Sequence, residues 1–273
     1  MRKWKPLAFA TAALCLAAAP VGSQGSESGL WGGEVLSQDP PAIARSGATL
    51  IPMRPIFSQL GAAVSWDATA KTAVATKEGL SLRLTLGRKQ MLVNGQPVPL
   101  DIAPEMWDGS VMVPLAAVAK AFGATVRYDS ASRMAIIIHG GTWWRTLVWP
   151  GKPDLTPRQA AELVFAEVAL EPETKAIGRS GFRVVKQSGQ AIHCVWENRA
   201  GVARMVMVMS RDRSHVEARI IVLHLGERDV ISFTWGSRKL EDGFKSLGLP
   251  TAILEAVQAG PGADLAGWVK TGR

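Results

Sequence analysis

The sequence predicts an α+β protein: an N-terminal duplicated helix-plus-antiparallel-strand module, followed by a second small α+β domain with an antiparallel sheet. Two observations predict this class. The segment LGAAVSWD at 60–67 returns in closely similar form as FGATVRYD at 122–129. Short segments of alternating apolar and polar residues, separated by turn residues, also follow one another along both halves, as in antiparallel strands. A chain of 273 residues is long enough for two such domains.

Residues 1–23 have the layout of a secretory signal peptide. A basic start is followed by an apolar stretch over 6–20 and by small residues, and we place the cleavage after Ser23. The apolar stretch is shorter than the roughly 20 residues of a membrane span. A retained membrane anchor and lipidation at Cys15 are the alternatives. Cleavage would leave Cys194, which we expect to be buried, so the sequence predicts an exported bacterial protein without an intramolecular disulfide bond.

Two copies of one pattern make up the N-terminal domain, which spans 26–140; the copies cover 30–78 and 92–140. One constant offset aligns the two copies throughout without a gap. Identical residues at equivalent positions include Pro52 and Pro114, Gly61 and Gly123, Val64 and Val126, and Asp67 and Asp129. Two copies are too few for an open solenoid, so we expect them to pair as subunits of one small domain.

Each copy reads in order as a helix, a strand and a turn. Pro52 suits the start of the helix, where its missing N–H has no cost, and Gly61 suits the left-handed position beyond the helix end. Val64 and Trp66 then share one face of a strand, and we expect the aromatic ring to pack on the preceding helix. Asp67 opens the turn that follows, because its carboxylate can accept backbone N–H groups.

The two aspartates at the ends of these strands, Asp67 and Asp129, have a second interpretation as a catalytic or metal-binding pair. Two turn residues in separate subunits have no physical reason to converge on one site. We therefore interpret both as structural residues that close turns.

The repeated module resembles the copper amine oxidase N-terminal-like domain, also called the stalk domain, over about residues 30–140. The matching residues are Ile51-Pro52-Met53-Arg54, Leu60-Gly61-Ala62, Val64, Trp66, Asp67, Asn94-Gly95, Val113-Pro114-Leu115 and Gly123-Ala124. The second copy departs from the family pattern at Ala116, where an arginine equivalent to Arg54 is usual. The resemblance implies an accessory module that is common in exported bacterial proteins and is often attached to other envelope domains.

The resemblance does not imply amine oxidation. Copper amine oxidases carry three histidine ligands in a separate large catalytic domain, together with a tyrosine that becomes the quinone cofactor. The single tyrosine of this chain, Tyr128, occupies the position that Trp66 fills in the first copy, which indicates packing. We therefore expect no copper or other metal, no cofactor and no amine oxidase activity.

Residues 141–157 read as a linker, because they contain glycines and prolines that break regular structure. This segment also contains Trp143, Trp144 and Trp149, which we identify as possible ligand or interface contacts. Such a cluster can stack on sugar rings or lie at a membrane interface. The alternative, which we favour, is that the three tryptophans join the two domains.

Residues 158–273 form the second α+β domain, whose function the sequence does not indicate. A helix is predicted over 156–170, where Thr156 is a plausible N-cap, and a short helical ending over 250–258. The strand candidates between these helices are GFRVVKQ, AIHCVWEN, ARMVMVMS, HVEARIIVLHL and DVISFTW. In the third of them, three methionines alternate with two valines, which predicts a central strand covered on both faces.

The same half contains residue types that can support chemistry, but not in a pattern that indicates a site. His193, His215 and His224 lack metal-binding spacing. Glu197 and Glu217 can be read as a carboxylate pair of the glycosidase kind, although charged residues on the wet face of a sheet are the simpler interpretation. The sequence contains no G-x-S-x-G, P-loop or G-x-G-x-x-G motif.

The charge and the missing motifs favour a binding protein. The formal charge of +8 loses the three basic residues of the leader, and the remainder is spread over both halves without the basic patches of a nucleic-acid site. We expect a non-enzymatic protein, extracellular or envelope-associated, whose stalk-like module acts in wall association, adhesion or spacing. Its C-terminal domain would bind a cell-wall polymer or an envelope protein. The alternatives are a wall-polymer hydrolase with its site in 158–273 and a small-ligand sensor.

Overall fold

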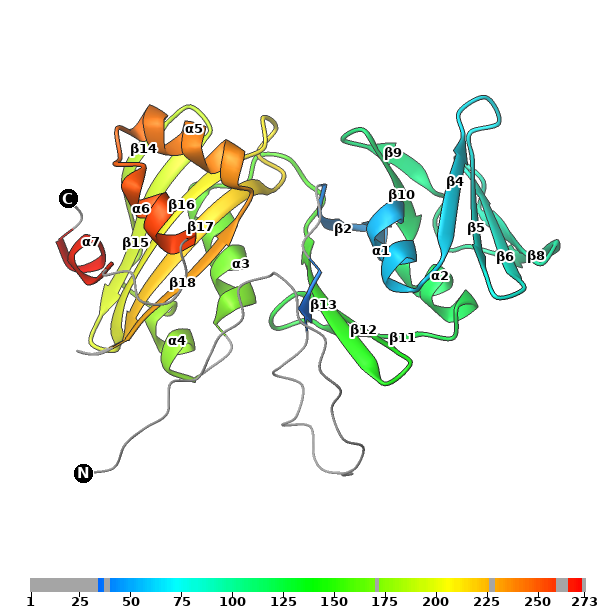
Figure 1. Cartoon of the computed structure of the whole chain (residues 1–273), viewed down its shortest axis with the longest axis horizontal. Coiled ribbons are helices and arrows are strands. Elements are labelled where there is room, and N and C mark those ends of the chain that lie inside the picture. Colours follow the sequence, from blue (N-terminus) through cyan, green and yellow to red (C-terminus); the bar gives the residue numbers. More distant parts are fainter. Residues whose placement is uncertain (1–33, 37–39, 170–171, 226–228, 259–264, 272–273) are drawn as a thin grey trace.

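The computed structural model describes residues 34–36, 40–169, 172–225, 229–258 and 265–271. The predicted signal peptide lies outside these residues. The described chain is a mixed α+β structure with three sheets, mostly antiparallel strands and short helices (Figure 1). Within the same residues, none of the helices has the length and apolar character that crossing a membrane requires.

An eight-stranded sheet lies between the other two sheets (Figure 1). Its strand order is β11-β12-β13-β2-β3-β10-β9, and β1 also pairs with β13. The pairings of β13 with β1 and with β2 are parallel, and the others are antiparallel. The strands are β1 (Glu34–Val35), β2 (Ala42–Arg45), β3 (Ala48–Pro52), β9 (Glu105–Trp107), β10 (Ser110–Pro114), β11 (Thr125–Asp129), β12 (Met134–His139) and β13 (Thr142–Trp149).

Elements of the N-terminal half recur in the same order, at the offset that aligns Gly61 with Gly123. β3, α1 (Met53–Gln59), β4 (Ala63–Asp67) and β5 (Thr72–Lys77) correspond to β10, α2 (Leu115–Ala121), β11 and β12. The strands β3 and β10 pair with Ile51 opposite Val113, and these two residues are equivalent in the repeat. Equivalent residues therefore meet at the centre of this strand pair, as they do across a local twofold axis.

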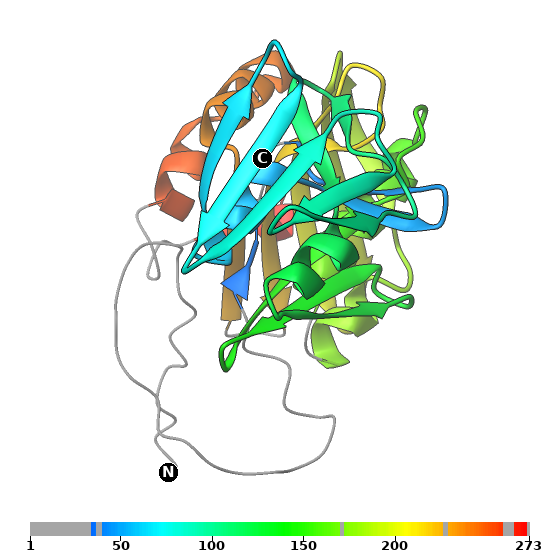
Figure 2. The same cartoon turned by 90° about the vertical axis from the view of Figure 1, so that its right-hand side faces the viewer.

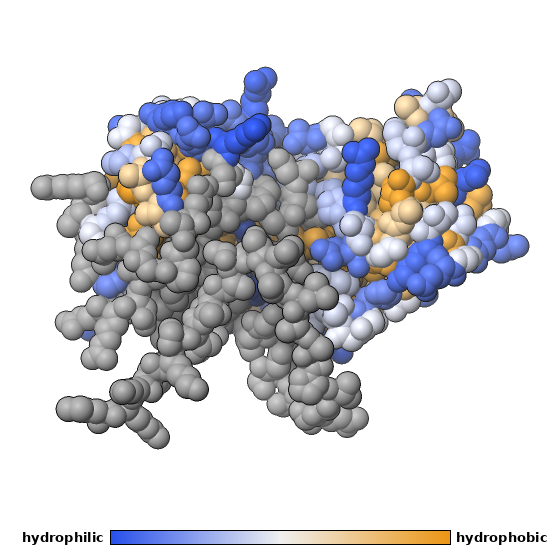
Figure 3. Space-filling model, in the orientation of Figure 1, coloured by the Kyte–Doolittle hydropathy of each residue, from blue (hydrophilic) through white to orange (hydrophobic). Residues whose placement is uncertain are grey.

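A five-stranded meander, β4-β5-β6-β7-β8, covers one side of the eight-stranded sheet (Figure 2). Its remaining strands are β6 (Leu80–Thr85), β7 (Gln90–Val93) and β8 (Gln96–Pro99). The helices α1 and α2 contribute to the core between the two sheets, where Phe57 and Phe122 meet edge to face with ring centroids 5.6 Å apart. Figure 3 shows hydrophobic side chains at the surface over α1 and β4, where Val64 and Trp66 are only partly buried.

The third sheet is the antiparallel meander β14-β15-β16-β17-β18. Its strands are β14 (Arg183–Ser188), β15 (Ala191–Asn198), β16 (Gly201–Met209), β17 (Val216–Leu225) and β18 (Asp229–Trp235), which confirms the five predicted strand segments. Met205, Met207 and Met209 face one core, whereas Val206 and Val208 face the other. The prediction that β16 is central and covered on both faces is therefore also confirmed.

Helices cover both faces of this third sheet. α5 (Ser237–Leu247), α6 (Ala252–Gln258) and α7 (Ala266–Thr271) pack on one face, and α3 (Pro157–Val168) and α4 (Pro172–Ile177) lie on the other. The predicted helices at 156–170 and 250–258 are confirmed. α5 was not among the predicted helices, although Leu240, Phe244 and Leu247 have helical spacing and are all buried.

The structure corrects the prediction of a linker over 141–157, because residues 142–149 form β13. This strand alternates between two cores: Trp144 and Val148 face the core of the N-terminal half, and Leu147 and Trp149 face the core that includes α3. This alternation is typical of a strand that is buried on both faces. It was not recognised in the sequence because glycine and proline residues flank the strand. The connection to α3 is left to the residues after Trp149.

The two halves share one continuous hydrophobic core. Ile43, Leu50, Met112 and Trp149 of the eight-stranded sheet belong to the same buried cluster as α3 and the methionine face of β16. α3 therefore lies between two sheets, as Figure 1 also shows. Its start is fixed by a capping box, in which Thr156 Oγ1 accepts from the backbone of Gln159 at 3.2 Å and Gln159 Oε1 accepts from the backbone of Thr156 at 2.9 Å.

Candidate functional site at the junction of the two halves

The three tryptophans singled out in the sequence lie at different depths along β13. Trp149 is 2% exposed and belongs to the core shared by the two halves, so its packing joins them as the favoured interpretation expected. Trp144 is 8% exposed and packs in the core of the N-terminal half. Trp143 is only half-buried. The prediction of a ligand contact therefore rests on Trp143, because the rings of the other two are enclosed by packing.

The two repeated aspartates lie in turns on separate sheets. Asp67 Oδ1 accepts the backbone N–H groups of Thr69 and Ala70, each at 2.9 Å. Asp129 Oδ1 accepts the backbone N–H of Ala131 at 3.0 Å, and its other oxygen accepts the hydroxyl of Ser132. This bond from Ser132 is the main reason that the pKa of Asp129 lies below its usual value. Both carboxylates close turns, as predicted.

The structure separates the two glutamates that were read as a carboxylate pair. Glu197 lies near the end of β15 opposite Val202, which in turn pairs with His224 at the far end of β17. Glu217 lies at the other end of β17. Glu197 instead pairs with Arg183 at 3.6 Å. A site built from Glu197 and Glu217 is therefore ruled out by the strand register.

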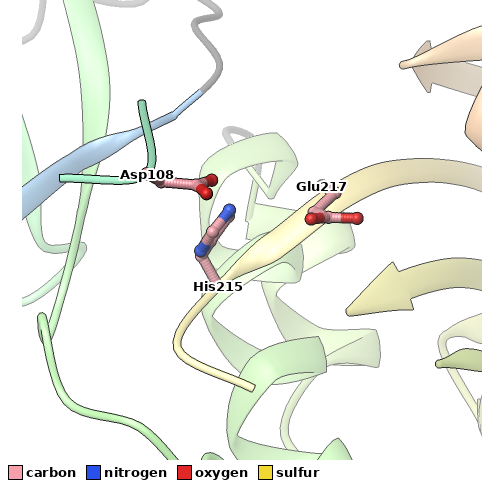
Figure 4. Close-up of side chains that lie close together, drawn as sticks. All are labelled: Asp108, His215 and Glu217. Atoms are coloured by element: carbon pink, nitrogen blue, oxygen red, sulfur yellow. The ribbon is translucent and has the colours of Figure 1, made fainter. Parts of the chain in front are cut away.

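A different group of side chains meets at the junction of the two halves. Asp108, His215 and Glu217 each offer a nitrogen or oxygen donor, and these donor atoms all lie within 4.8 Å of one another. Figure 4 shows the Asp108 carboxylate and the His215 ring close together, with Glu217 beside them at the start of β17, two residues after His215. We call these three residues the junction triad. One of them comes from the N-terminal half and two from the C-terminal sheet.

A tight hairpin carries Asp108 to this junction. Asp108 and Gly109 link β9 to β10, and both have positive φ angles, 45° and 73°. The equivalent hairpin of the first copy, between β2 and β3, has Ser46 and Gly47 with φ angles of 49° and 81°. Aspartate and serine thus occupy the same backbone conformation in the two copies, and only the second copy places a carboxylate there.

A β-bulge places Glu217 at the start of β17. The register between β16 and β17 passes from Val208 opposite Ala218 to Met209 opposite Val216, which leaves Glu217 as the extra residue. Bulges change the direction of a side chain and occur often beside functional sites. Glu217 also pairs with Lys239 of α5, with 3.5 Å between Oε2 and Nζ.

A hydrogen-bond chain orients the histidine of the triad. His215 Nδ1 lies 3.0 Å from Ser214 Oγ, and Ser214 Oγ donates to Asp212 Oδ1 at 2.8 Å. Because the hydroxyl group of Ser214 donates its proton to Asp212, the Ser214 oxygen accepts a hydrogen bond from the Nδ1–H group of His215. The neutral His215 ring then has its lone pair on Nε2. Burial raises the pKa of Asp212, but hydrogen bonds from Ser214 and Ser210 outweigh it, so that the pKa is lowered and the carboxylate stays ionised.

Aromatic rings enclose the same histidine. His215 is 1% exposed, with the ring of Trp107 at 5.2 Å and the ring of Trp149 at 6.5 Å between centroids. The triad opens on a pocket of about 340 Å³. Its lining residues, which we call the junction pocket, are Trp107, Asp108, Ser210, Arg211, Asp212, Ser214, His215 and Glu217. The pocket thus combines one partly exposed indole with charged groups of both signs.

The junction triad was not predicted from the sequence because its three residues are not close together along the chain. The pair His215 and Glu217 was visible as an i, i+2 pattern, which places two side chains on one face of a strand. Asp108 was visible only as a hairpin residue, more than a hundred positions earlier in the sequence. Only the packing of the β9–β10 hairpin against the C-terminal sheet brings the three together.

The fold defines a protein of two joined α+β halves, the first built from recurring strand–helix–strand elements. Residues 31–137 match the family of the copper amine oxidase N-terminal domain, as the resemblance predicted, and the rest of the chain is unassigned. Domains of this family are typical of bacterial cell-surface proteins. Trp107 and Asp108 of the junction pocket lie within the matched segment.

Proposed function

We propose that this is an exported, non-enzymatic bacterial cell-envelope protein that binds a wall polymer through the junction pocket. Its stalk-like module, a duplication of one strand–helix–strand unit, would hold the C-terminal domain at the wall. The recurrence of elements at one constant offset and the pairing of Ile51 with Val113 support the duplication. The family match supports a place at the cell surface.

The observation that carries the proposed binding function is the composition of the junction pocket. Trp107 is partly exposed and offers an indole face, and aromatic faces are common platforms for sugar rings. Asp108 and Glu217 can accept hydrogen bonds from hydroxyl groups, and Arg211 can donate to carboxylates or amide carbonyls. A wall polysaccharide with acidic or acylated substituents offers the complementary groups.

Retention on purified cell wall tests the proposal. We expect the mature protein to be retained and Trp107→Ala to lose at least half of that retention. The control is Tyr128→Ala, because Tyr128 is an exposed aromatic residue, 50% exposed, on β11 outside the junction pocket. Trp143→Ala examines the remaining prediction from the sequence. Negligible retention of the unmodified protein, or equal retention of all variants, would contradict wall binding.

A wall-polymer hydrolase is the second candidate function, because the carboxylates of Asp108 and Glu217 lie close together in the pocket. Their oxygen donors lie within 4.8 Å, close to the spacing of roughly 5–5.5 Å between the carboxyl groups of retaining glycosidases. Release of new reducing ends from purified wall that Glu217→Gln abolishes would support this function. Binding without any release of reducing ends would support the non-enzymatic proposal.

A small-ligand sensor, the remaining alternative, also depends on this pocket. Within the described part of the C-terminal sheet, residues of β15, β16 and β17 pack into hydrophobic cores on both faces. The junction pocket at the end of β17 is then the place at which a small ligand would bind.

A further inference from the structure

We propose that the junction triad binds a divalent transition-metal ion of the zinc type, and that this ion ties the N-terminal module to the C-terminal sheet. The inference does not depend on wall binding. It rests on three features of the described residues: the donor set, the orientation of the histidine, and the origin of the donors in both halves.

The donor set is the first feature. Imidazole nitrogen and carboxylate oxygen are both ligands of zinc, and a site with three protein ligands leaves a fourth position for water. The donor atoms lie within 4.8 Å of one another. Donors at about 2.1 Å from a tetrahedral ion are about 3.4 Å apart, so the side chains must close by roughly 1 Å. Asp108 is exposed and Glu217 is only partly buried, so both side chains have room for this movement.

The orientation of His215 is the second feature. The chain from Nδ1 through Ser214 to the ionised Asp212 leaves Nε2 as the basic nitrogen of the neutral ring. Figure 4 shows one nitrogen of this ring turned toward the carboxylate of Asp108. Histidine ligands of metal ions are commonly held in this way by a hydrogen bond on the other nitrogen. A nitrogen donor also selects transition metals over magnesium and calcium, which prefer oxygen donors.

The segment that carries His215 is firmly held, which favours a preformed site. The backbone of Ser210 donates to the carbonyl of His215 at 2.9 Å, and Ser210 Oγ accepts from the backbone of Ser214 at 2.9 Å. Asp154 and Leu155, which precede α3, donate backbone hydrogen bonds to the carbonyls of Asp212 and Arg213, each at 3.0 Å. The loop before β17 is therefore fixed on both sides.

Two cations compete with a metal ion at this position. Arg211 lines the pocket, and Lys239 pairs with Glu217. The side chain of Lys239 is 45% exposed, so it can move into solvent when an ion takes its place beside the carboxylate. Removal of the Lys239 charge should therefore raise the affinity of the triad for a metal ion. If the Lys239–Glu217 ion pair had only a structural role, the same removal would not raise it.

The origin of the donors in both halves is the third feature. Asp108 belongs to the β9–β10 hairpin of the matched family domain, whereas His215 lies in the loop directly before β17 and Glu217 at the start of β17 in the C-terminal half. An ion that binds the folded protein but not the unfolded chain stabilises it by mass action. Zinc should therefore raise the midpoint of thermal unfolding of the whole protein, and a chelator should reverse the rise.

Calorimetric titration of tag-free, chelator-treated mature protein with zinc tests the proposal. We expect one zinc ion per chain and no binding of magnesium under the same conditions. Asp108→Ser should lower the zinc affinity at least tenfold, and it inserts the residue that the equivalent hairpin carries at Ser46 with the same positive φ, so the fold is retained. His215→Gln should abolish binding, and His139→Gln, at a partly exposed histidine of β12, is the matched control.

Lys239→Met provides the second measurement, with a several-fold gain in zinc affinity expected. Absence of zinc binding, or an affinity that Asp108→Ser and His215→Gln leave unchanged, would overturn the proposal. Wall retention of the same preparations in the presence of a chelator separates the two proposals. Zinc binding without wall retention contradicts only the proposed function, and wall retention without zinc binding contradicts only the metal site.

Discussion

At the scale of single residues, three turn aspartates of the N-terminal half have different roles, which depend on the groups that lie beside them. Asp67 and Asp129 accept hydrogen bonds from their own turns. Asp108 occupies a hairpin whose counterpart carries Ser46, and its carboxylate is turned toward His215 of the other half. Local backbone chemistry thus explains the first two residues completely, whereas the third is explained only by a contact with a distant segment.

Replacement of a turn aspartate should weaken the fold modestly. In Asp67→Ala, the backbone N–H groups of Thr69 and Ala70 lose their common acceptor, so we expect the free energy of unfolding to fall by about 1 kcal/mol. Urea unfolding followed by far-UV circular dichroism measures the change. Asp101→Ala, at an exposed aspartate, is the control. Equal effects of the two variants would show that the turn hydrogen bonds contribute nothing specific.

His193 shows how burial can couple stability to pH. It is 1% exposed, its ring stacks on Trp268 with centroids 5.8 Å apart, and Arg204 Nη1 lies 3.4 Å from its Nε2. Burial lowers the pKa of His193 to about 4, and the charges of Arg204 and Arg183 add to this effect. Arg204 also donates to the carbonyl of Val269 at 2.7 Å, so this cluster holds α7 on the sheet.

The stability of the protein should therefore fall with acidification between pH 6.5 and 4. The unfolded chain binds a proton at His193 near pH 6.5, but the folded chain binds it only near pH 4, where its lowered pKa lies. The stabilisation is fully present above pH 6.5 and is lost as the pH falls to about 4, by up to about 3 kcal/mol. Urea titrations at pH 7.0, 5.5 and 4.5 measure this loss.

The variant His193→Gln isolates this contribution from those of other groups. Its stability at pH 7 will be lower for packing reasons, but its loss between pH 7.0 and 4.5 should be smaller than that of the unmodified protein by the contribution of His193. Parallel pH profiles for the two proteins would contradict the assignment.

At the scale of elements, α3 is the component that most directly connects the two halves. It lies between the C-terminal sheet and the eight-stranded sheet, and its apolar face belongs to the core that both share. Glu167 of this helix is 5% exposed and forms an ion pair with Arg219 of β17. On the other side, burial lowers the pKa of Arg145 of β13, and the charge of Glu167 partly offsets this effect. One carboxylate thus interacts with arginines of both sheets.

Removal of the charge of Glu167 should destabilise the protein strongly. Glu167→Gln leaves two partly buried arginines without their common counter-charge, and breaking a buried ion pair in this way costs about 3–5 kcal/mol. Glu162→Gln is the matched control on the same helix, because the Glu162–Arg158 pair is exposed and should contribute less than about 1 kcal/mol. Chemical denaturation compares the two, and similar losses would contradict the special role of Glu167.

At the scale of the whole molecule, the structure consists of layers that share hydrophobic cores. From one end to the other these layers are the helices α5 to α7, the C-terminal sheet, α3, the eight-stranded sheet, the helices α1 and α2, and the β4–β8 sheet. β13 contributes to two of the three cores through its two faces. The two halves are therefore expected to unfold together rather than as independent domains.

Truncation of Trp149 should separate the unfolding of the two halves. The side chain is 2% exposed in the shared core, so Trp149→Ala should lower the free energy of unfolding by about 3–5 kcal/mol. We also expect the single calorimetric transition of the unmodified protein to broaden or split into two. Trp143→Ala, at a half-buried position of the same strand, should keep a single transition. A single sharp transition in Trp149→Ala would contradict the coupling of the halves through this core.

The sequence by itself determined what depends on neighbours along the chain. Residues such as Pro52, Gly61 and Asp67 set helix starts, helix ends and turns through their own backbone preferences, and the alternation of apolar residues defined most strands. The motifs built from these signals also predicted the family that residues 31–137 match. The prediction of a linker over 141–157 was wrong. Glycine and proline indicate local breaks in regular structure, but they do not indicate that the segment between them is a strand buried on both faces.

Tertiary structure alone decided where the chemistry lies. The junction triad requires a hairpin of the first half, a bulge in β17 and a shared core that presses the two together. None of these contacts is encoded by residue spacing, because the donors come from segments far apart in the sequence whose approach depends on the summed packing of entire layers. The periodicity of apolar residues predicts which face of each segment is buried. Only the complete fold shows which other segment packs against that face.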